Sequence, residues 1–135
     1  MNAIVCIDDE GGMMFNHRRQ SQDSALRAHI AELTSGYPLW MNAYSARQFG
    51  DMLPENAVVD EDFLARAGTD DFCFVENADL EPVLDRIAEL IVYRWNRDYP
   101  RDTILPADLG DWILVSSENF AGSSHDEITQ EVYTR

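Results

Sequence analysis

Basic residues are scarce in this chain. Its 135 residues include 10 Lys and Arg against 25 Asp and Glu, which gives a formal net charge of −15 at pH 7. A surplus of negative charge repels both nucleic-acid phosphates and anionic membrane surfaces. The composition therefore predicts a protein with neither nucleic acid nor membrane as a partner.

Cysteines and long apolar runs are also few. Cys6 and Cys73 are the only two cysteines, and each lies inside a short apolar run, where a free thiol behaves as a small hydrophobe. No apolar run approaches the roughly 20 residues that span a bilayer, and no charged-then-apolar leader opens the chain. We expect a cytoplasmic protein that forms one domain over residues 1–135 without disulfides.

Several familiar site motifs are missing. There is no Walker loop and no Gly-x-Ser-x-Gly segment. His17, His29 and His125 share no metal-ligand spacing, and neither cysteine is paired with one of them. The acidic run at residues 8–10 is interpreted as a solvated turn, because three adjacent carboxylates rarely converge on one cation. We therefore predict no metal site.

What the chain does have is an alternation of short apolar strands and helical segments. The expected strands cover residues 3–7, 39–41, 57–59, 71–75, 90–95, 112–116 and 128–133. The turn signal at 121–124 pairs the last two strands as an antiparallel hairpin. This order predicts an α/β fold with a mostly parallel central sheet, helices on both faces and an antiparallel C-terminal hairpin.

The first helix has the clearest signals. Leu26, Ile30 and Leu33 recur at helical spacing as one apolar stripe, and we expect all three to be buried. The helix is expected to begin between positions 21 and 25, after a non-helical loop over 11–22. The side chains expected to face outward are Arg27, His29 and Glu32. A second helix is expected over 42–49 and a third after its cap at Asp79, with an irregular connection over 60–69.

Three segments carry a resemblance to a known family. Residues 102–106 read Asp-Thr-Ile-Leu-Pro ahead of Trp112; Thr34, Pro38 and Met41 keep a fixed spacing; and a Leu-Pro turn lies at 53–54. In order and spacing these segments resemble the dihydrofolate reductase family over nearly the whole chain. The resemblance implies a dihydrofolate-reductase-like fold. It also implies that the 11–22 loop corresponds to the family's mobile loop over the active site, with Asn16 at the position of an asparagine in that loop.

The departures from that family concern its cofactor and its folate. The Gly-Arg pair beneath the cofactor phosphates is replaced by Asn42-Ala43, and the Gly-Gly turn beside the pyrophosphate by Glu76-Asn77. Alanine cannot replace an arginine that pairs with phosphate, and Glu76 brings negative charge to a place meant for an anion. The family's carboxylic acid on the first helix falls on Ala25 or Leu26. We therefore predict that NADPH does not bind and that conventional folate reduction is lost.

The densest polar cluster is the loop just before the first helix. An anion pocket there would use Arg18 or Arg19 as a bidentate clamp, His17 as acid or base, and Asn16 and Gln22 as hydrogen-bond donors. Asp23 is the second candidate for catalysis. The alternative is structural: these side chains pin the loop to the acidic run at residues 8–10 through ion pairs.

Two hypotheses for function remain open. The first is a dihydrofolate-reductase-like protein that has lost its chemistry and works as a small-molecule-binding or protein-interaction module. The second is an enzyme of altered specificity, acting on a small anionic substrate through the loop at 17–19, or one with residual reductase activity. The feature that distinguishes the two hypotheses is whether His17, an arginine and Asp23 converge on one cavity or point to solvent.

Overall fold

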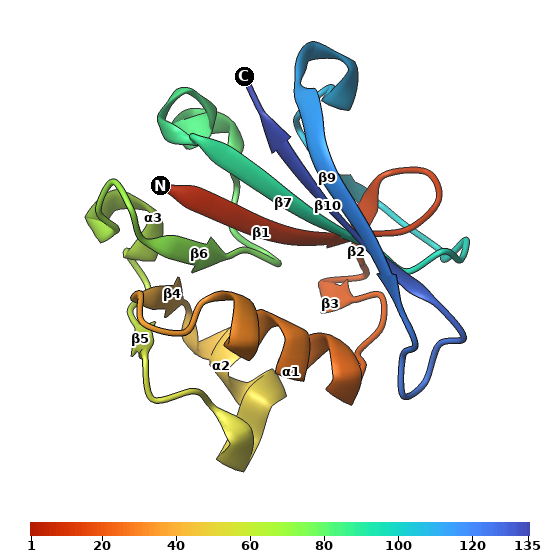
Figure 1. Ribbon diagram of the computed structural model, residues 1–135, viewed down its shortest axis with the longest axis horizontal. Helices are drawn as coiled ribbons and strands as arrows, with labels where there is room; N and C mark the ends of the chain where they lie inside the picture. The colour runs from red at the N-terminus through yellow and green to blue at the C-terminus, as the bar shows by residue number, and fades with distance from the viewer.

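A seven-stranded sheet runs through the molecule with β1 at its centre, in the order β5-β4-β6-β1-β7-β10-β9 (Figure 1). The computed structural model describes residues 1–135. The strands of this sheet are β1 (Asn2–Ile7), β4 (Leu39–Met41), β5 (Ala57–Val59), β6 (Phe72–Phe74), β7 (Glu89–Arg94), β9 (Ile113–Phe120) and β10 (Ile128–Thr134).

The strand directions match the prediction. β1 pairs in parallel with β6 and with β7, and β4 pairs in parallel with β5 and β6. β10 is antiparallel to β7 and to β9, so the C-terminal hairpin forms one edge of the sheet. The α/β class, the mostly parallel sheet and the antiparallel hairpin are confirmed.

Helical segments cover both faces of the sheet. α1 (Ser24–Leu33) and α2 (Ala43–Phe49) lie together on one face, in Figure 1 below β1 and β6. That face holds Ile4 of β1 and Ile91 of β7. α3 (Phe63–Arg66) and the 3-10 helix η2 (Glu81–Arg86) pack on the other face. Two further 3-10 helices are η1 (Gly50–Met52) and η3 (Leu109–Asp111), and none of the helices is long and apolar enough to cross a bilayer.

The first helix begins where it was expected. Asp23 is its N-cap and accepts the backbone N–H groups of Ala25 and Leu26 at 2.9 and 3.2 Å. Leu26 and Ile30 are buried, and Leu33 is partly buried. The outward position predicted for His29 is wrong, because its ring stacks on Phe120 of β9 with 4.3 Å between centroids.

The segment 11–22 is non-helical as predicted, but it is not a plain loop. It forms a hairpin of β2 (Gly12–Phe15) and β3 (Arg18–Arg19), joined to β8 (Thr103–Ile104) in a second sheet. Asn16 and His17 form the turn with φ of 52° and 63°. Positive φ at both central residues gives a turn whose twist matches the paired strands.

Two other segments differ from the prediction. The connection at 60–69 contains the one-turn helix α3, because Phe63 is buried against the sheet. The helix expected after Asp79 is the 3-10 helix η2. Pro82 lies at its start, and η2 is only six residues long, so no regular α-helix follows β6.

Candidate functional site

The hairpin β2–β3 lies over the carboxyl ends of the central strands, and Asp8 anchors it there. Asp8 follows β1 and is fully buried. Its carboxylate accepts the backbone N–H groups of Glu10 and Gly12 at 2.9 and 2.8 Å and the Gln20 amide at 3.0 Å. Burial alone would raise the pKa of Asp8, but these hydrogen bonds outweigh it and lower the pKa below its ordinary value.

Arg19 of β3 fills the centre of this sheet edge. Its guanidinium donates two hydrogen bonds to Glu76, from Nε to Oε2 at 2.9 Å and from Nη2 to Oε1 at 3.1 Å. The same guanidinium lies over the Tyr44 ring at 4.3 Å. Ser45 and Gln48 of α2 donate to the Glu76 carboxylate at 2.8 and 3.0 Å, so both charges are held in one network.

Little free space remains around this ion pair. The cavity enclosed by Arg19, Glu76, Cys6 and Trp95 has a volume of about 10 Å³. That is at the lower limit for holding one water molecule. The space directly beside the Arg19–Glu76 pair is therefore filled by the hairpin.

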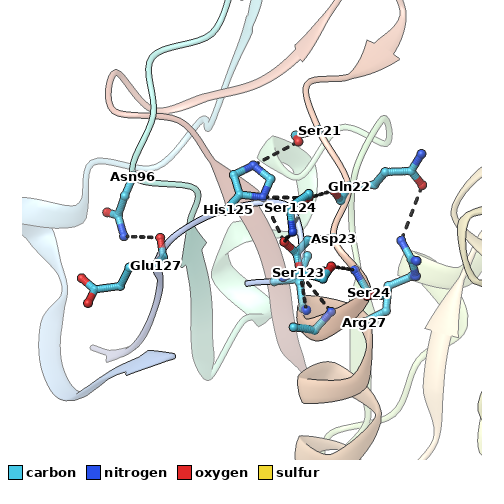
Figure 2. Close-up of polar contacts among 12 residues, drawn as sticks. Ser21, Gln22, Asp23, Ser24, Arg27, Asn96, Ser123, Ser124, His125 and Glu127 are labelled. Atoms are coloured by element: carbon cyan, nitrogen blue, oxygen red, sulfur yellow. Dashed lines mark hydrogen bonds and ion pairs between the residues drawn. The ribbon is translucent and has the colours of Figure 1, made fainter. Parts of the chain in front are cut away.

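A second polar cluster joins the start of α1 to the loop between β9 and β10 (Figure 2). The Asp23 carboxylate accepts the backbone N–H groups of Ser123 and Ser124 at 3.0 and 2.8 Å. The side-chain hydroxyls of both serines lie at 3.1 Å from it. His125 Nδ1 is 3.0 Å from Asp23 Oδ2. Asp23 thus fixes a loop a hundred residues away in the sequence.

The environment of Asp23 keeps its carboxylate ionised. Asp23 is 2% exposed and His125 is 5% exposed. Burial alone would raise the pKa of Asp23, but donors from Ser123, Ser124, His125 and Leu26 lower the pKa far below its ordinary value. An ionised carboxylate only accepts hydrogen bonds, so the proton between Asp23 and His125 belongs to His125 Nδ1.

The other nitrogen of His125 faces two hydroxyl groups. Its Nε2 is 3.1 Å from Ser21 Oγ and 2.9 Å from the Tyr99 hydroxyl oxygen. The imidazole stacks on Trp95 with 4.6 Å between centroids, which holds the ring plane in place. Ser21, His125 and Asp23 therefore form a continuous chain of hydrogen-bonding groups, which Figure 2 shows running from the segment before α1 to the β9–β10 loop.

This cluster opens into a pocket at the surface. The pocket has a volume of about 410 Å³ and is lined by Arg19, Gln20, Ser21, Gln22, Arg97, Tyr99, Ser124 and His125. Arg97 is exposed, and its guanidinium forms no ion pair or hydrogen bond within the protein. The pocket thus combines a free cation with several neutral hydrogen-bonding groups, in a chain that is strongly acidic overall.

The structure brings Arg19, Gln22 and Asp23 to one pocket and leaves the other predicted site residues outside it. Asn16 and His17 lie at the exposed tip of the hairpin, and Arg18 beside them is exposed. Arg19 points inward to Glu76, whereas its ion-pair partners were expected among residues 8–10. Gln22 lies on the pocket wall, with its side-chain oxygen 3.5 Å from Arg27 Nη1. Asp23 lies beneath the pocket, and the structure does not bring His17 to it.

The four positions that depart from the family's cofactor motifs, Asn42, Ala43, Glu76 and Asn77, all form hydrogen bonds within the protein. Asn42 caps α2 and donates to Asn77 Oδ1 at 2.8 Å. Glu61 accepts the backbone N–H of Ala43 at 2.8 Å. The start of α2 and the end of β6 are therefore each occupied by a negative side chain of the protein itself, Glu61 and Glu76.

The sequence interpretation missed Ser21, Tyr99 and His125 as members of a site. Ser123 and Ser124 were interpreted only as part of the turn at 121–124, and His125 was considered only as a metal ligand. One signal was available in the sequence. Ser21 and Asp23 lie just before the first helix, and His125 lies just after the turn of the predicted C-terminal hairpin. No three His, Cys, Asp or Glu side chains lie close enough together to hold a metal ion.

Comparison with known proteins supports the fold. No protein-family model matches the sequence, and no curated protein matches it. Among solved structures, dihydrofolate reductase from Enterococcus faecalis, complexed with NADP(H) and RAB-propyl, has a similar fold with a TM-score of 0.68. The alignment covers 99% of this chain and 95% of that chain at 13% identity. The dihydrofolate-reductase-like fold is thus confirmed, and the likeness at this identity concerns the fold alone.

Proposed function

We propose that this protein uses a dihydrofolate-reductase-like fold to bind a small anionic molecule, and that it has lost NADPH-dependent folate reduction. The observation that carries the proposal is the contrast between two neighbouring places. The space beside the Arg19–Glu76 pair is a cavity of only about 10 Å³, whereas the neighbouring pocket around His125 measures about 410 Å³ and presents the unpaired Arg97.

The charges near the end of β6 argue against NADPH. A pocket of about 270 Å³ there is lined by Glu76, Asp79 and Glu81 among its residues. Each carboxylate would lie near a pyrophosphate and repel it. Helix N-termini attract phosphate through free N–H groups, but Glu61 already accepts the Ala43 N–H of α2, and no α-helix follows β6.

The pocket around His125 favours a ligand with a carboxylate or phosphate group. Arg97 can donate a bidentate pair of hydrogen bonds to such a group. Gln20, Gln22 and Ser124 add neutral donors and acceptors that fix orientation. A protein with a net charge of −15 repels anions in general, so the local cation matters more here than it would elsewhere.

The binding proposal is tested by thermal shift with inorganic phosphate, succinate and citrate. At least one of these anions is expected to raise the melting temperature of the native protein. Arg97→Ala should remove most of that rise. Arg47→Ala is the matched control, because Arg47 is also exposed and unpaired but lies on α2 outside the pocket. Equal stabilisation of both variants would contradict the assignment of the pocket.

The loss of the cofactor is tested separately by isothermal titration with NADPH. No heat of binding is expected at micromolar protein concentrations. Binding in the low micromolar range or tighter would contradict the proposal, as would oxidation of NADPH in the presence of dihydrofolate.

A second candidate function, protein interaction, is favoured by β9. This strand forms the free edge of the sheet over eight residues and exposes Ile113, Leu114 and Val115. A free apolar edge is a template for pairing with another strand. We propose a second copy of this chain as the occupant, because β9 carries only one charged residue, Glu118, over its eight residues, so two acidic copies can pair along it with little charge repulsion.

The self-pairing of β9 is tested by light scattering on a size-exclusion column. The expected mass is twice the 15.4 kDa of one chain. Val115→Lys should return the mass to that of a monomer, whereas His17→Lys, at the distant hairpin tip, should not. A monomeric native protein at high micromolar concentration would rule out this candidate.

A further inference from the structure

We propose that Ser21 is a nucleophile activated by His125 and Asp23, and that the pocket above it hydrolyses small carboxylic esters. The inference deepens the proposed binding function, because it uses the same pocket. It rests on geometry: Ser21 Oγ is 3.1 Å from His125 Nε2, and His125 Nδ1 is 3.0 Å from Asp23 Oδ2. Hydroxyl, imidazole and carboxylate in this order are the groups that activate a serine in unrelated hydrolase folds.

Each member of the chain is held for its role. Asp23 is fixed by the backbone N–H groups of Leu26, Ser123 and Ser124, so its carboxylate cannot turn away from the imidazole. In the tautomer that carries its proton on Nδ1, directed at Asp23, the Nε2 lone pair faces Ser21. Trp95 stacks on the imidazole and fixes its plane. Ser21 itself is partly exposed and lines the open pocket, where an ester can reach it.

Donors for the developing negative charge are also present. The backbone N–H groups of Ser21 and Gln22 form no hydrogen bond within the protein. The N–H of the residue after a nucleophile is one of the groups that serve as an oxyanion donor in other serine hydrolases. The Tyr99 hydroxyl lies 2.9 Å from the same His125 nitrogen that faces Ser21, so it is a neighbour of Ser21 Oγ.

The reaction follows from these positions. Ser21 Oγ attacks the ester carbonyl carbon while its proton moves to His125 Nε2. The bond between that carbon and the alcohol oxygen then breaks, and His125 gives its proton to the leaving alcohol. Water attacks the acyl-serine in the second half, loses a proton to His125, and releases the carboxylic acid as the proton returns to Ser21. The net change is ester plus water to acid plus alcohol.

Arg97 restricts the class of ester. It lies in the same pocket as Ser21 and has no partner within the protein. An ester with a second, free carboxylate can pair with Arg97 while its carbonyl carbon approaches Ser21. The substrate class is therefore a small ester of a dicarboxylic acid, with one carboxylate left free.

The test uses two substrates, p-nitrophenyl acetate and the mono-p-nitrophenyl ester of succinic acid. Release of nitrophenol by the native protein is expected above the solution rate, faster for the succinyl ester. Ser21→Ala should lower the rate about 100-fold or to the solution background. His125→Gln should do the same, and Ser21→Cys should keep acyl transfer. Ser35→Ala is the matched control at an exposed serine outside the pocket.

Covalent labelling identifies the nucleophile directly. A fluorophosphonate should add one mass increment per chain, and peptide mapping should place it on Ser21. The chain contains no lysine, so acyl transfer to lysine amines does not contribute background. Circular dichroism of Ser21→Ala confirms that the variant is folded. No adduct on Ser21, together with equal hydrolysis by the native protein and Ser21→Ala, would overturn the proposal.

The two proposals fail in different ways. Stabilisation by succinate without any Ser21-dependent hydrolysis would support the binding function and contradict the role of Ser21 as a nucleophile. The opposite result is Ser21-dependent hydrolysis of p-nitrophenyl acetate with no stabilisation by any anion and no effect of Arg97→Ala. It would support the role of Ser21 as a nucleophile and contradict the anion-binding pocket.

Discussion

Arg19 and Glu76 form a two-bond ion pair that ties the β2–β3 hairpin to the end of β6. The pair fills the space between the hairpin and the carboxyl ends of β1 and β6. Its two charges come from residues 57 positions apart in the sequence, so the pair joins segments that no local interaction would hold together.

Loss of Arg19 is expected to destabilise the protein. Glu76 has only 8% of its side chain exposed, and Arg19→Ala would leave that carboxylate with hydrogen-bond donors but no cation. Since Arg19 itself is 21% exposed, we expect a cost of about 2 kcal/mol in the free energy of unfolding by urea, below the value for a fully buried pair. Arg18→Ala, at the exposed neighbour, should change it by less than about 0.5 kcal/mol. Equal effects of the two substitutions would show that the ion pair contributes little.

The stability contributed by Asp23 should depend on pH. Its pKa is far below the ordinary value in the native state, so the unfolded state binds more protons as the pH falls. The contribution is therefore complete above the unfolded pKa of about 4 and declines at lower pH. We expect Asp23→Asn to cost about 2 kcal/mol at pH 7 and progressively less below pH 4. A difference from the native protein that stays constant between pH 7 and pH 3 would contradict this. Asp9→Asn, at an exposed carboxylate, is the control.

Gly122 should not tolerate a side chain. A Cβ at this position would lie 2.6 Å from both Asp23 Oδ2 and the His125 backbone oxygen. Gly122→Ala must therefore push the β9–β10 loop away from Asp23, at a cost of about 2 kcal/mol in the free energy of unfolding. Ala121→Ser, at the exposed neighbour, should be nearly neutral. A native-like melting temperature for Gly122→Ala would mean that the loop moves aside without loss.

Cys73 should be chemically inert in the folded protein. Burial raises its pKa to about 12, so almost no thiolate is present at pH 8. Iodoacetamide should leave Cys73 unmodified in the native state and alkylate it fully in guanidinium chloride, as read by peptide mass spectrometry. Rapid native-state alkylation at Cys73 would show that β6 opens locally.

The sequence predicted the elements that depend on local patterns. The apolar residues Leu26 and Ile30 give the helix period, and the strands of the main sheet are marked by short apolar runs. The β2–β3 hairpin was not predicted, because β3 has only two residues and the turn of the hairpin, Asn16-His17, lacks glycine. Arg19 of β3 is also held by Glu76, which lies 57 positions away in the sequence.

The site was harder to predict than the fold. Asp23 was correctly placed near the start of α1, but its partners at 123–125 are a hundred residues further on. No helical or strand period relates positions so far apart. The pairing of β10 with β7 places the β9–β10 loop beside α1, and that pairing is a property of the whole sheet.

The insertion of β10 between β7 and β9 has a consequence for folding during synthesis. α1 and the strands up to β7 leave the ribosome well before residues 123–134, and at that stage Asp23 has only its own helix to bind. The polar side chains at the start of α1 then face water, and β7 has an unpaired edge. When β10 emerges and pairs with β7, it closes that edge and delivers His125 to Asp23 in the same step. A nascent chain stalled before β10 should therefore be a target for chaperones and should lack any activity that depends on His125.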